Sequence, residues 1–124
     1  MTTDATPTEL FLDGAGTTPT QRITIEEARA VTFDIQVVAI SDGASANFAA
    51  GFHIRGIIRR FDPINSINII GTPIKEVLGV ETGAWDVNVS ADVPNNALKV
   101  TVTGDPTRPV RWVATVRTTE VQFP

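Results

Sequence analysis

Apolar and polar residues alternate with a period of two along most of this chain, and this pattern limits the possible folds most strongly. In residues 31–40, the apolar side chains at alternate positions are Val31, Phe33, Ile35, Val37 and Ala39. Successive side chains of a strand point to opposite faces of the sheet, so the pattern predicts strands with one buried face. Val, Ile and Thr account for 43 of the 124 residues, against four Leu and two Lys. Branching at Cβ favours strands, which argues against helical bundles and repeated βαβ folds.

Turn-forming residues divide this pattern into eight or nine expected strands, each bounded by Gly, Pro, Asn or Asp. The nine expected ranges are 9–12, 21–25, 31–40, 48–61, 67–70, 74–80, 85–91, 98–103 and 110–121. Gly71-Thr72-Pro73 is expected to separate the fifth range from the sixth. Many short strands with such turns predict an all-β fold, an antiparallel β-sandwich of the jelly-roll type, as a single domain over residues 1–124.

Two segments are expected to depart from this regular pattern. Thr24 to Ala30 has helical features, because Thr24 and Glu27 have the spacing of a capping box. That segment is long enough for one short helical turn at most. Residues 1–8 are rich in Thr and are expected to form an extended N-terminal arm.

The charge balance and the absence of cysteine exclude several functions. The formal net charge is −4, which disfavours general binding to nucleic acid because phosphate groups would be repelled. With no cysteine, the chain has no thiol catalyst, no Cys-ligated zinc and no disulfide. The start of the chain lacks the pattern of a signal peptide, and no apolar run approaches the roughly 20 residues of a membrane span. We therefore expect no membrane association, and a protein that is made as a soluble cytosolic chain or that leaves the cell inside a larger particle.

Candidate catalytic residues are few. His53 is the single histidine, and a Ser-His-Asp arrangement would need it beside Ser45, Ser66 or Ser90. The Gly-x-Ser-x-Gly motif of a nucleophile elbow is absent. We therefore expect His53 to be an ordinary strand residue on a solvent or interface face, and we expect no enzymatic activity.

Ligand-binding motifs are equally scarce. One histidine without cysteine leaves no zinc or iron site, and the Asp-x-Asp-x-Asp-Gly pattern of calcium loops does not occur. Gly14-Ala15-Gly16 lacks the third glycine and the following helix of a phosphate-binding loop. We expect neither a metal nor a cofactor.

Arginines on two of the expected strands are the most informative polar feature. One strand places His53, Arg55, Ile57 and Arg59 on one face, and the other places Arg111, Val113, Thr115 and Arg117 together. Arginine is favoured at protein interfaces because its planar guanidinium makes several directed hydrogen bonds. The alternatives are cross-strand pairing with Asp34, Asp86 or Glu76 on a solvated face, and a local contact with nucleic acid.

Some expected strands are apolar on both faces. Val37 to Ile40 forms such a run, as do the isoleucine pairs at 57–58 and 69–70. An antiparallel sandwich usually has one wet face per sheet, so these runs indicate an outer face covered by another subunit, or by a loop. The candidate interface residues are Val38, Ile40, His53, Arg55, Ile57, Arg59, Arg111, Val113 and Arg117.

Three segments resemble a β-rich module of structural proteins from tailed bacteriophages and prophages. They are Thr2–Gly14 (TTDATPTELFLDG), Ala84–Asp92 (AWDVNVSAD) and Val110–Val121 (VRWVATVRTTEV). Together they cover both ends and the centre of the chain, whereas residues 61–74 match less well. The module usually belongs to longer tail or fibre chains, and here we expect it to stand alone.

The resemblance implies a role in virion architecture without catalysis. We expect a small capsid decoration (cement) protein or a tail-surface protein that forms homo-oligomers and contacts other virion proteins, such as the major capsid or tail proteins. The alternative is a carbohydrate-binding module for host recognition in a tail fibre. Glycan sites usually present exposed aromatic rings, and Trp85 and Trp112 both fall in register with the core, so the sequence disfavours this alternative.

Overall fold

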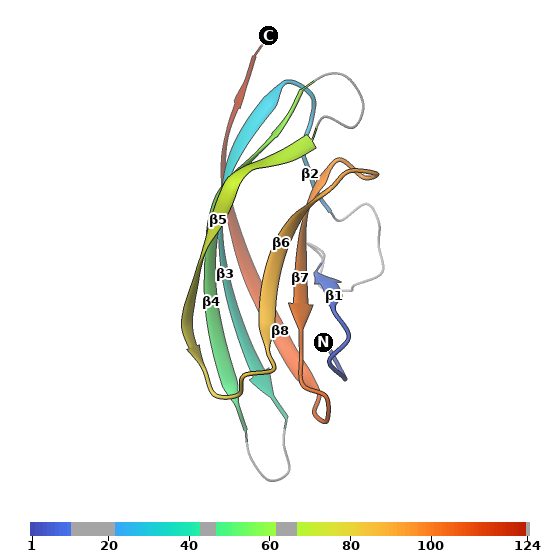
Figure 1. Ribbon diagram of the computed structural model, residues 1–124, viewed down its shortest axis with the longest axis vertical. Coiled ribbons are helices and arrows are strands. Elements are labelled where there is room, and N and C mark those ends of the chain that lie inside the picture. Colours follow the sequence, from blue (N-terminus) through green and yellow to red (C-terminus); the bar gives the residue numbers. More distant parts are fainter. Residues whose placement is uncertain (11–21, 43–46, 62–66, 124) are drawn as a thin grey trace.

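The computed structural model describes residues 1–10, 22–42, 47–61 and 67–123, and within these ranges it is all-β (Figure 1). The strands are β1 (Thr8–Leu10), β2 (Ile23–Thr24), β3 (Arg29–Ser41), β4 (Ala49–Arg60), β5 (Ile67–Val80), β6 (Asp86–Asp92), β7 (Ala97–Thr103) and β8 (Val110–Gln122). They form two antiparallel four-stranded sheets, which confirms the predicted β-sandwich. We call them the large sheet and the small sheet.

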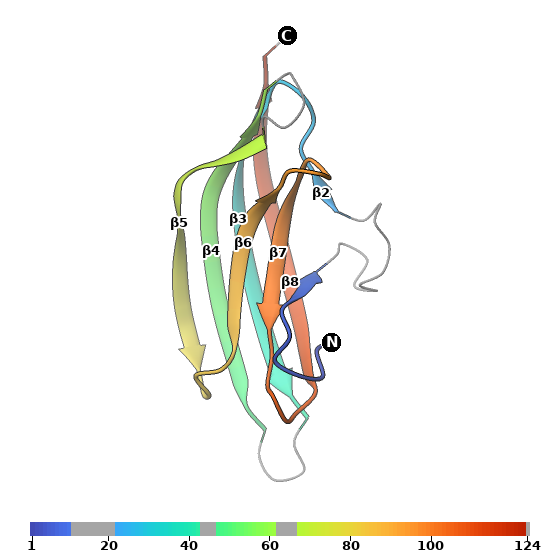
Figure 2. The same cartoon turned by 45° about the vertical axis from the view of Figure 1, so that its right-hand side comes forward.

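The large sheet has the strand order β5-β4-β3-β8, and its strands are 12 to 14 residues long. Its centre is β3, where Ile35 lies opposite Ile54 of β4 and Val116 of β8. The last strand of the chain therefore joins β3 rather than its predecessor β7, and this crossover connects the two layers seen in Figures 1 and 2.

The small sheet is organised around β7. Strand β6 pairs with β7 along one side, while β1 and β2 pair with successive halves of its other side (Figure 2). These strands are 2 to 7 residues long, so the small sheet is much shorter than the large one. The ends of the large sheet consequently extend beyond it.

The core lies between the inner faces of the two sheets. The largest fully buried side chains are Phe33, Phe52, Ile35, Ile54, Ile58, Val31, Val87, Val102 and Val110. Trp85 and Trp112 join them, with ring centroids 6.1 Å apart and planes tilted by 54°. The alternation in the sequence correctly predicted these inward-facing positions, because they follow directly from the period of a strand.

Strand β5 corrects one sequence prediction. The two strands expected at 67–70 and 74–80 form one continuous strand, despite Gly71-Thr72-Pro73 between them. Gly71 adopts a φ of 69°, which glycine tolerates readily. Among the described residues β5 pairs only with β4, so Pro73 can occupy it without losing a ladder hydrogen bond to a second neighbour. The register with β4 shifts at two places to absorb the irregularity.

The helical turn predicted over Thr24–Ala30 is wrong. Thr24 ends β2, and Ile25 is buried with its N–H donated to the carbonyl oxygen of Asn96 at 2.8 Å. Arg60 donates to the carbonyl oxygen of Ile25 at 3.0 Å, so both backbone groups of Ile25 are used outside a helix. Ala28 has a φ of 56°. Tertiary contacts therefore override the capping-box spacing.

The N-terminal segment packs on its own domain. Thr2 is buried and forms a β-bridge with Val110 at the start of β8. The indole N–H of Trp112 donates to Thr2 Oγ1 at 3.0 Å. The fit is tight, because a Cβ added at Gly104 would lie 2.1 Å from that oxygen. The segment is therefore attached to the sandwich at Thr2 and at Thr8, where β1 begins, whereas residues 3–8 are exposed.

Candidate functional site

The outer face of the large sheet, which points away from the small sheet, brings together every candidate interface residue from the sequence. These residues lie on β3 (Val38, Ile40), β4 (His53, Arg55, Ile57, Arg59) and β8 (Arg111, Val113, Arg117). Their inward-facing neighbours are buried, as the alternation requires. One surface therefore carries all nine residues, and it divides into a polar band and an apolar end.

The polar band crosses the middle of this face. His53 Nε2 lies 2.6 Å from Asp34 Oδ1, and Arg55 donates to Glu76 at 2.8 Å. His53 Nδ1 lies 3.9 Å from the same Glu76 carboxylate. The cross-strand pairing considered from the sequence therefore occurs for His53 and Arg55. Exposed pairs of this kind typically contribute about 0.2–1 kcal/mol, so the band is a patterned surface more than a source of stability.

Asp86, the third carboxylate considered for arginine pairing, lies elsewhere. It belongs to β6, and its Oδ1 lies 2.6 Å from Lys75 Nζ on β5. Burial raises the pKa of Asp86, but hydrogen bonds from Lys75 and the Val87 backbone outweigh it and hold this pKa below its usual range. Lys75 also donates to the carbonyl oxygen of Val87 at 3.1 Å. This cluster ties the edge of the large sheet to the small sheet.

Arginines of β8 border the face on one side. Neither Arg111 nor Arg117 forms an ion pair with any residue in the described ranges. Arg117 lines two adjoining hollows of about 400 and 330 Å³, both of which it shares with Asp34. Arg59 differs from these two, because its guanidinium stacks 4.5 Å from the ring centroid of Phe61. The β8 side of the face therefore carries two positive charges that form no ion pair among the described residues.

The apolar end consists of Val38, Ile40, Leu78 and Val113, whose exposed fractions are 57%, 54%, 62% and 63%. Val38 pairs with Val113 on one side and with Gly51 on the other. A Cβ added at Gly51 would lie 3.6 Å from the Cβ of Leu78, an ordinary contact distance, so Leu78 lies beside this glycine on the same face. Four aliphatic side chains from three strands thus form one exposed patch.

Leu78 is the member of this patch that the sequence did not identify. Glu76 pairs with His53 on this face, so alternation along β5 places Leu78, two residues later, on the same face. The register between β4 and β5 shifts just after Leu78, where Gly51 pairs with Gly79. The two-residue spacing from Glu76 is the available sequence signal, although the pairing of Glu76 with His53 is visible only in the structure.

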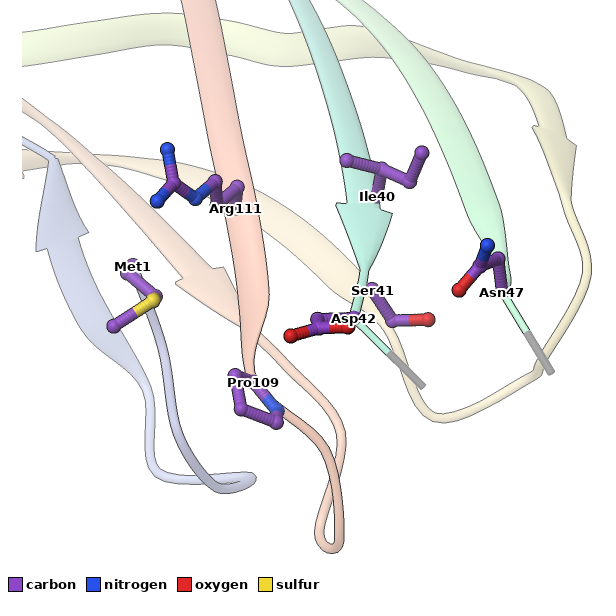
Figure 3. Close-up of a pocket in the computed structure, with 7 residues that line it drawn as sticks. All are labelled: Met1, Ile40, Ser41, Asp42, Asn47, Pro109 and Arg111. Carbon is purple, nitrogen blue, oxygen red and sulfur yellow. The ribbon is translucent and has the colours of Figure 1, made fainter. Parts of the chain in front are cut away.

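A pocket of about 460 Å³ adjoins the apolar end (Figure 3). Its lining residues come from the N-terminal segment, the end of β3, the segment before β4 and the start of β8: Met1, Ile40, Ser41, Asp42, Asn47, Pro109 and Arg111. Ile40 belongs to both the pocket and the apolar end, so the two features form one continuous surface. Arg111 and Asp42 give this pocket charges of both signs.

The residues considered for catalysis lie in different places. His53 lies between two carboxylates on the large sheet, and Ser90 lies on β6 of the small sheet. Ser45 and Ser66, the other serines considered as partners of His53, lie outside the described residues. No group of three or more His, Cys, Asp or Glu is placed to hold a metal ion within the part of the chain that the structure describes.

Both tryptophans lie in the core. The Trp85 indole N–H donates to Asp105 at 3.2 Å, and Trp112 donates to Thr2. Hydrogen bonding from the Thr107 backbone, and also from Trp85, holds the pKa of Asp105 below its usual range, although burial opposes this shift. The indole rings are therefore structural elements rather than exposed platforms.

Comparisons with known proteins returned no match among family models, curated proteins or solved structures. In the described ranges, no helix is long and apolar enough to cross a membrane.

Proposed function

We propose that this protein is a non-enzymatic structural protein of a bacteriophage virion, a small self-associating capsid decoration (cement) or tail-surface protein that stabilises the particle. The observation that carries the proposal is the apolar end of the large sheet. A stable sandwich already buries its core between the two sheets, so Val38, Ile40, Leu78 and Val113 contribute little to folding. Contiguous exposed apolar residues of this kind typically mark interaction sites.

The surroundings of the apolar end fit a docking surface. Interfaces combine an apolar centre with a polar rim, and arginine is enriched in them. Here the polar band with His53 and Arg55 borders the apolar end on the same face, and Arg111 and Arg117 lie along β8. The aliphatic side chains would supply affinity, and the charged groups would fix the register of a partner.

The assignment to a virion rests on the three segments that resemble the phage module. All three segments contribute strands to the sandwich: the first contains β1, the second contains β6, and the third forms most of β8. The partners would be other virion proteins, such as the major capsid or tail proteins, and further copies of this chain.

A carbohydrate-binding role in a tail fibre is the alternative function. Aromatic platforms for sugar rings need exposed faces, and both indole rings are buried with their N–H groups engaged. The sequence contains no tyrosine that could replace them. Saturable binding of the wild-type protein on a glycan array would favour this alternative over the structural role.

The test is the location of the protein on intact particles. We expect antibody labelling of phage particles, purified from the host that encodes this chain, to decorate the capsid or tail surface at many sites. Replacing Val113 by Asp should reduce that labelling, whereas Ser90→Asp, an exposed position on the small sheet, should leave it unchanged. Purified particles that lack the protein would contradict the proposal.

A further inference from the structure

We propose that a second copy of this chain covers the apolar end, with the two large sheets packed face to face about a two-fold axis that runs along the strands. This inference rests on the self-association in the proposed function and specifies its geometry. Under this symmetry, β5 of one copy faces β8 of the other, and β3 faces β4. Face-to-face sheets pack with strand directions within about 30° of each other, which this arrangement satisfies.

The sizes of the side chains support the pairing of β3 with β4. On the outer face β3 presents Val38 and Ile40, and their cross-strand partners on β4 are Gly51 and Ala49. The proposed axis places the large side chains of one copy over the small residues of the other. The surface is therefore self-complementary in shape, as a two-fold interface requires.

At the two borders of the face, Leu78 of β5 meets Val113 of the second copy. Both are more than three-fifths exposed, and each lies in the same row of the sheet as Val38 and Gly51. The symmetry produces this aliphatic contact twice, once on either side of the axis. The apolar end thus becomes a continuous buried layer.

The charges support the same orientation. Arg111 and Arg117 lie along β8, whereas the opposite border carries Glu76 of β5 and the exposed Glu81 that follows it. Glu81 lies beside Ala49, because its N–H donates to the Ala49 carbonyl oxygen at 3.2 Å. An axis along the strands brings the acidic border of one copy to the basic border of the other.

Other arrangements fit less well. A two-fold axis across the strands would place β8 over β8 and bring arginines together, which is repulsive. Edge-to-edge pairing through β5 is hindered by Pro73 and by the irregular register of that strand. Edge-to-edge pairing through β8 would leave the apolar end exposed.

The absence of cysteine allows a direct test by disulfide cross-linking. Two single variants, Leu78→Cys and Val113→Cys, would be mixed and oxidised, and the products separated by mass after one variant has been given a tag. We expect the mixed dimer to form at least about tenfold faster than either homodimer, because only the mixed pair brings both thiols together in one dimer. Ser90→Cys, on the small sheet, provides the rate of random collision.

The outcomes separate this inference from the proposed function. Faster cross-linking of Val113→Cys with itself would overturn the orientation, since it indicates β8 beside β8. Cross-linking no faster than that of Ser90→Cys in every combination would overturn the second copy as the occupant. Labelling of intact particles is an independent measurement, so the virion role could still stand if the second copy were excluded.

A charge exchange provides a second readout that does not depend on thiol chemistry. Arg111→Glu should raise the dissociation constant of the dimer by about tenfold, and adding Glu81→Arg should restore most of the affinity. An equal loss of affinity in the single and the double variant would contradict the proposed contact between the two borders.

Discussion

The two faces of the large sheet come from the same strands, yet they differ in what covers them. On the inner face, Phe33, Ile35 and Phe52 are buried beneath the small sheet. On the outer face, alternate positions of β3 carry Asp34 in the polar band and Val38 in the apolar end. Residues such as Ile35 and Val38 have similar chemistry in one strand, so the difference lies in the partner layer. Inner residues hold the fold together, and outer residues are the ones we propose to act in assembly.

The largest effect on stability should come from the inner face. Phe52→Ala removes a ring that is 1% exposed and leaves a cavity. We expect the free energy of unfolding to fall by about 3–5 kcal/mol, measured by denaturant titration. Val38→Ala on the outer face is the matched control and should change it little. Equal losses in the two variants would remove the distinction between the faces.

A smaller effect is expected at Gly56 of β4, which lies tightly against Phe33 on the inner face. A Cβ at this position would lie 2.7 Å from Cζ of Phe33, so the ring occupies the space that a side chain would need. We expect Gly56→Ala to cost about 1–3 kcal/mol of unfolding free energy, because overpacking forces the ring to move. In a chain that also carries Phe33→Leu, Gly56→Ala should cost less unfolding free energy. If the loss in the double variant equals the sum of the two single losses, the proposed clash is contradicted.

The link between the sheets should make stability depend on pH. The folded pKa of Asp86 lies below its unfolded value near 3.8, so its contribution is present above that pH and is lost as the pH falls through the folded pKa. Lys75→Met removes the cation responsible. We expect stability to decline less steeply with acid below about pH 5 in this variant, as measured by urea unfolding at several pH values. Identical pH profiles would contradict the role of Lys75.

The smallest effect on stability should come from the apolar end itself. Val113 is 63% exposed, and surface substitutions away from special features usually change stability by less than about 0.5 kcal/mol. Val113→Asp should therefore melt like the wild type while its self-association weakens at least about tenfold. A large drop in melting temperature would show that Val113 supports the fold, and the variant would then behave like one of the inner face.

The sequence predicted the fold class and the two faces of β3, β4 and β8 because the alternation of a strand is a local property. Trp85 and Trp112 were assigned to the core for the same reason. Local sequence patterns failed where contacts between distant segments determine the backbone conformation. Ile25 does not form the expected helical turn, because its N–H donates to Asn96 and its carbonyl oxygen accepts from Arg60.

The candidate face combines residues that the sequence singled out with an arrangement that only the structure reveals. Val38 and Ile40, which lie in a double-sided apolar run, are exposed on the outer face, and whether a partner covers them stays a prediction. Leu78 joins them because Glu76, two residues earlier, pairs with His53 on this face, and that pairing depends on how β4 and β5 align. Similarly, the contact of His53 with Asp34 and the ion pair of Arg55 with Glu76 depend on the order of the strands in the sheet.

Sedimentation equilibrium of the wild-type protein and of the Val38→Asp/Val113→Asp variant, over a wide range of concentration, tests the central claim most directly. The apolar end should drive self-association, so the average mass of the wild type should rise from 13.3 kDa towards twice that value. The folded variant should remain at the mass of a single chain. A wild type that stays monomeric at every concentration, or a variant that associates equally well, would contradict the account.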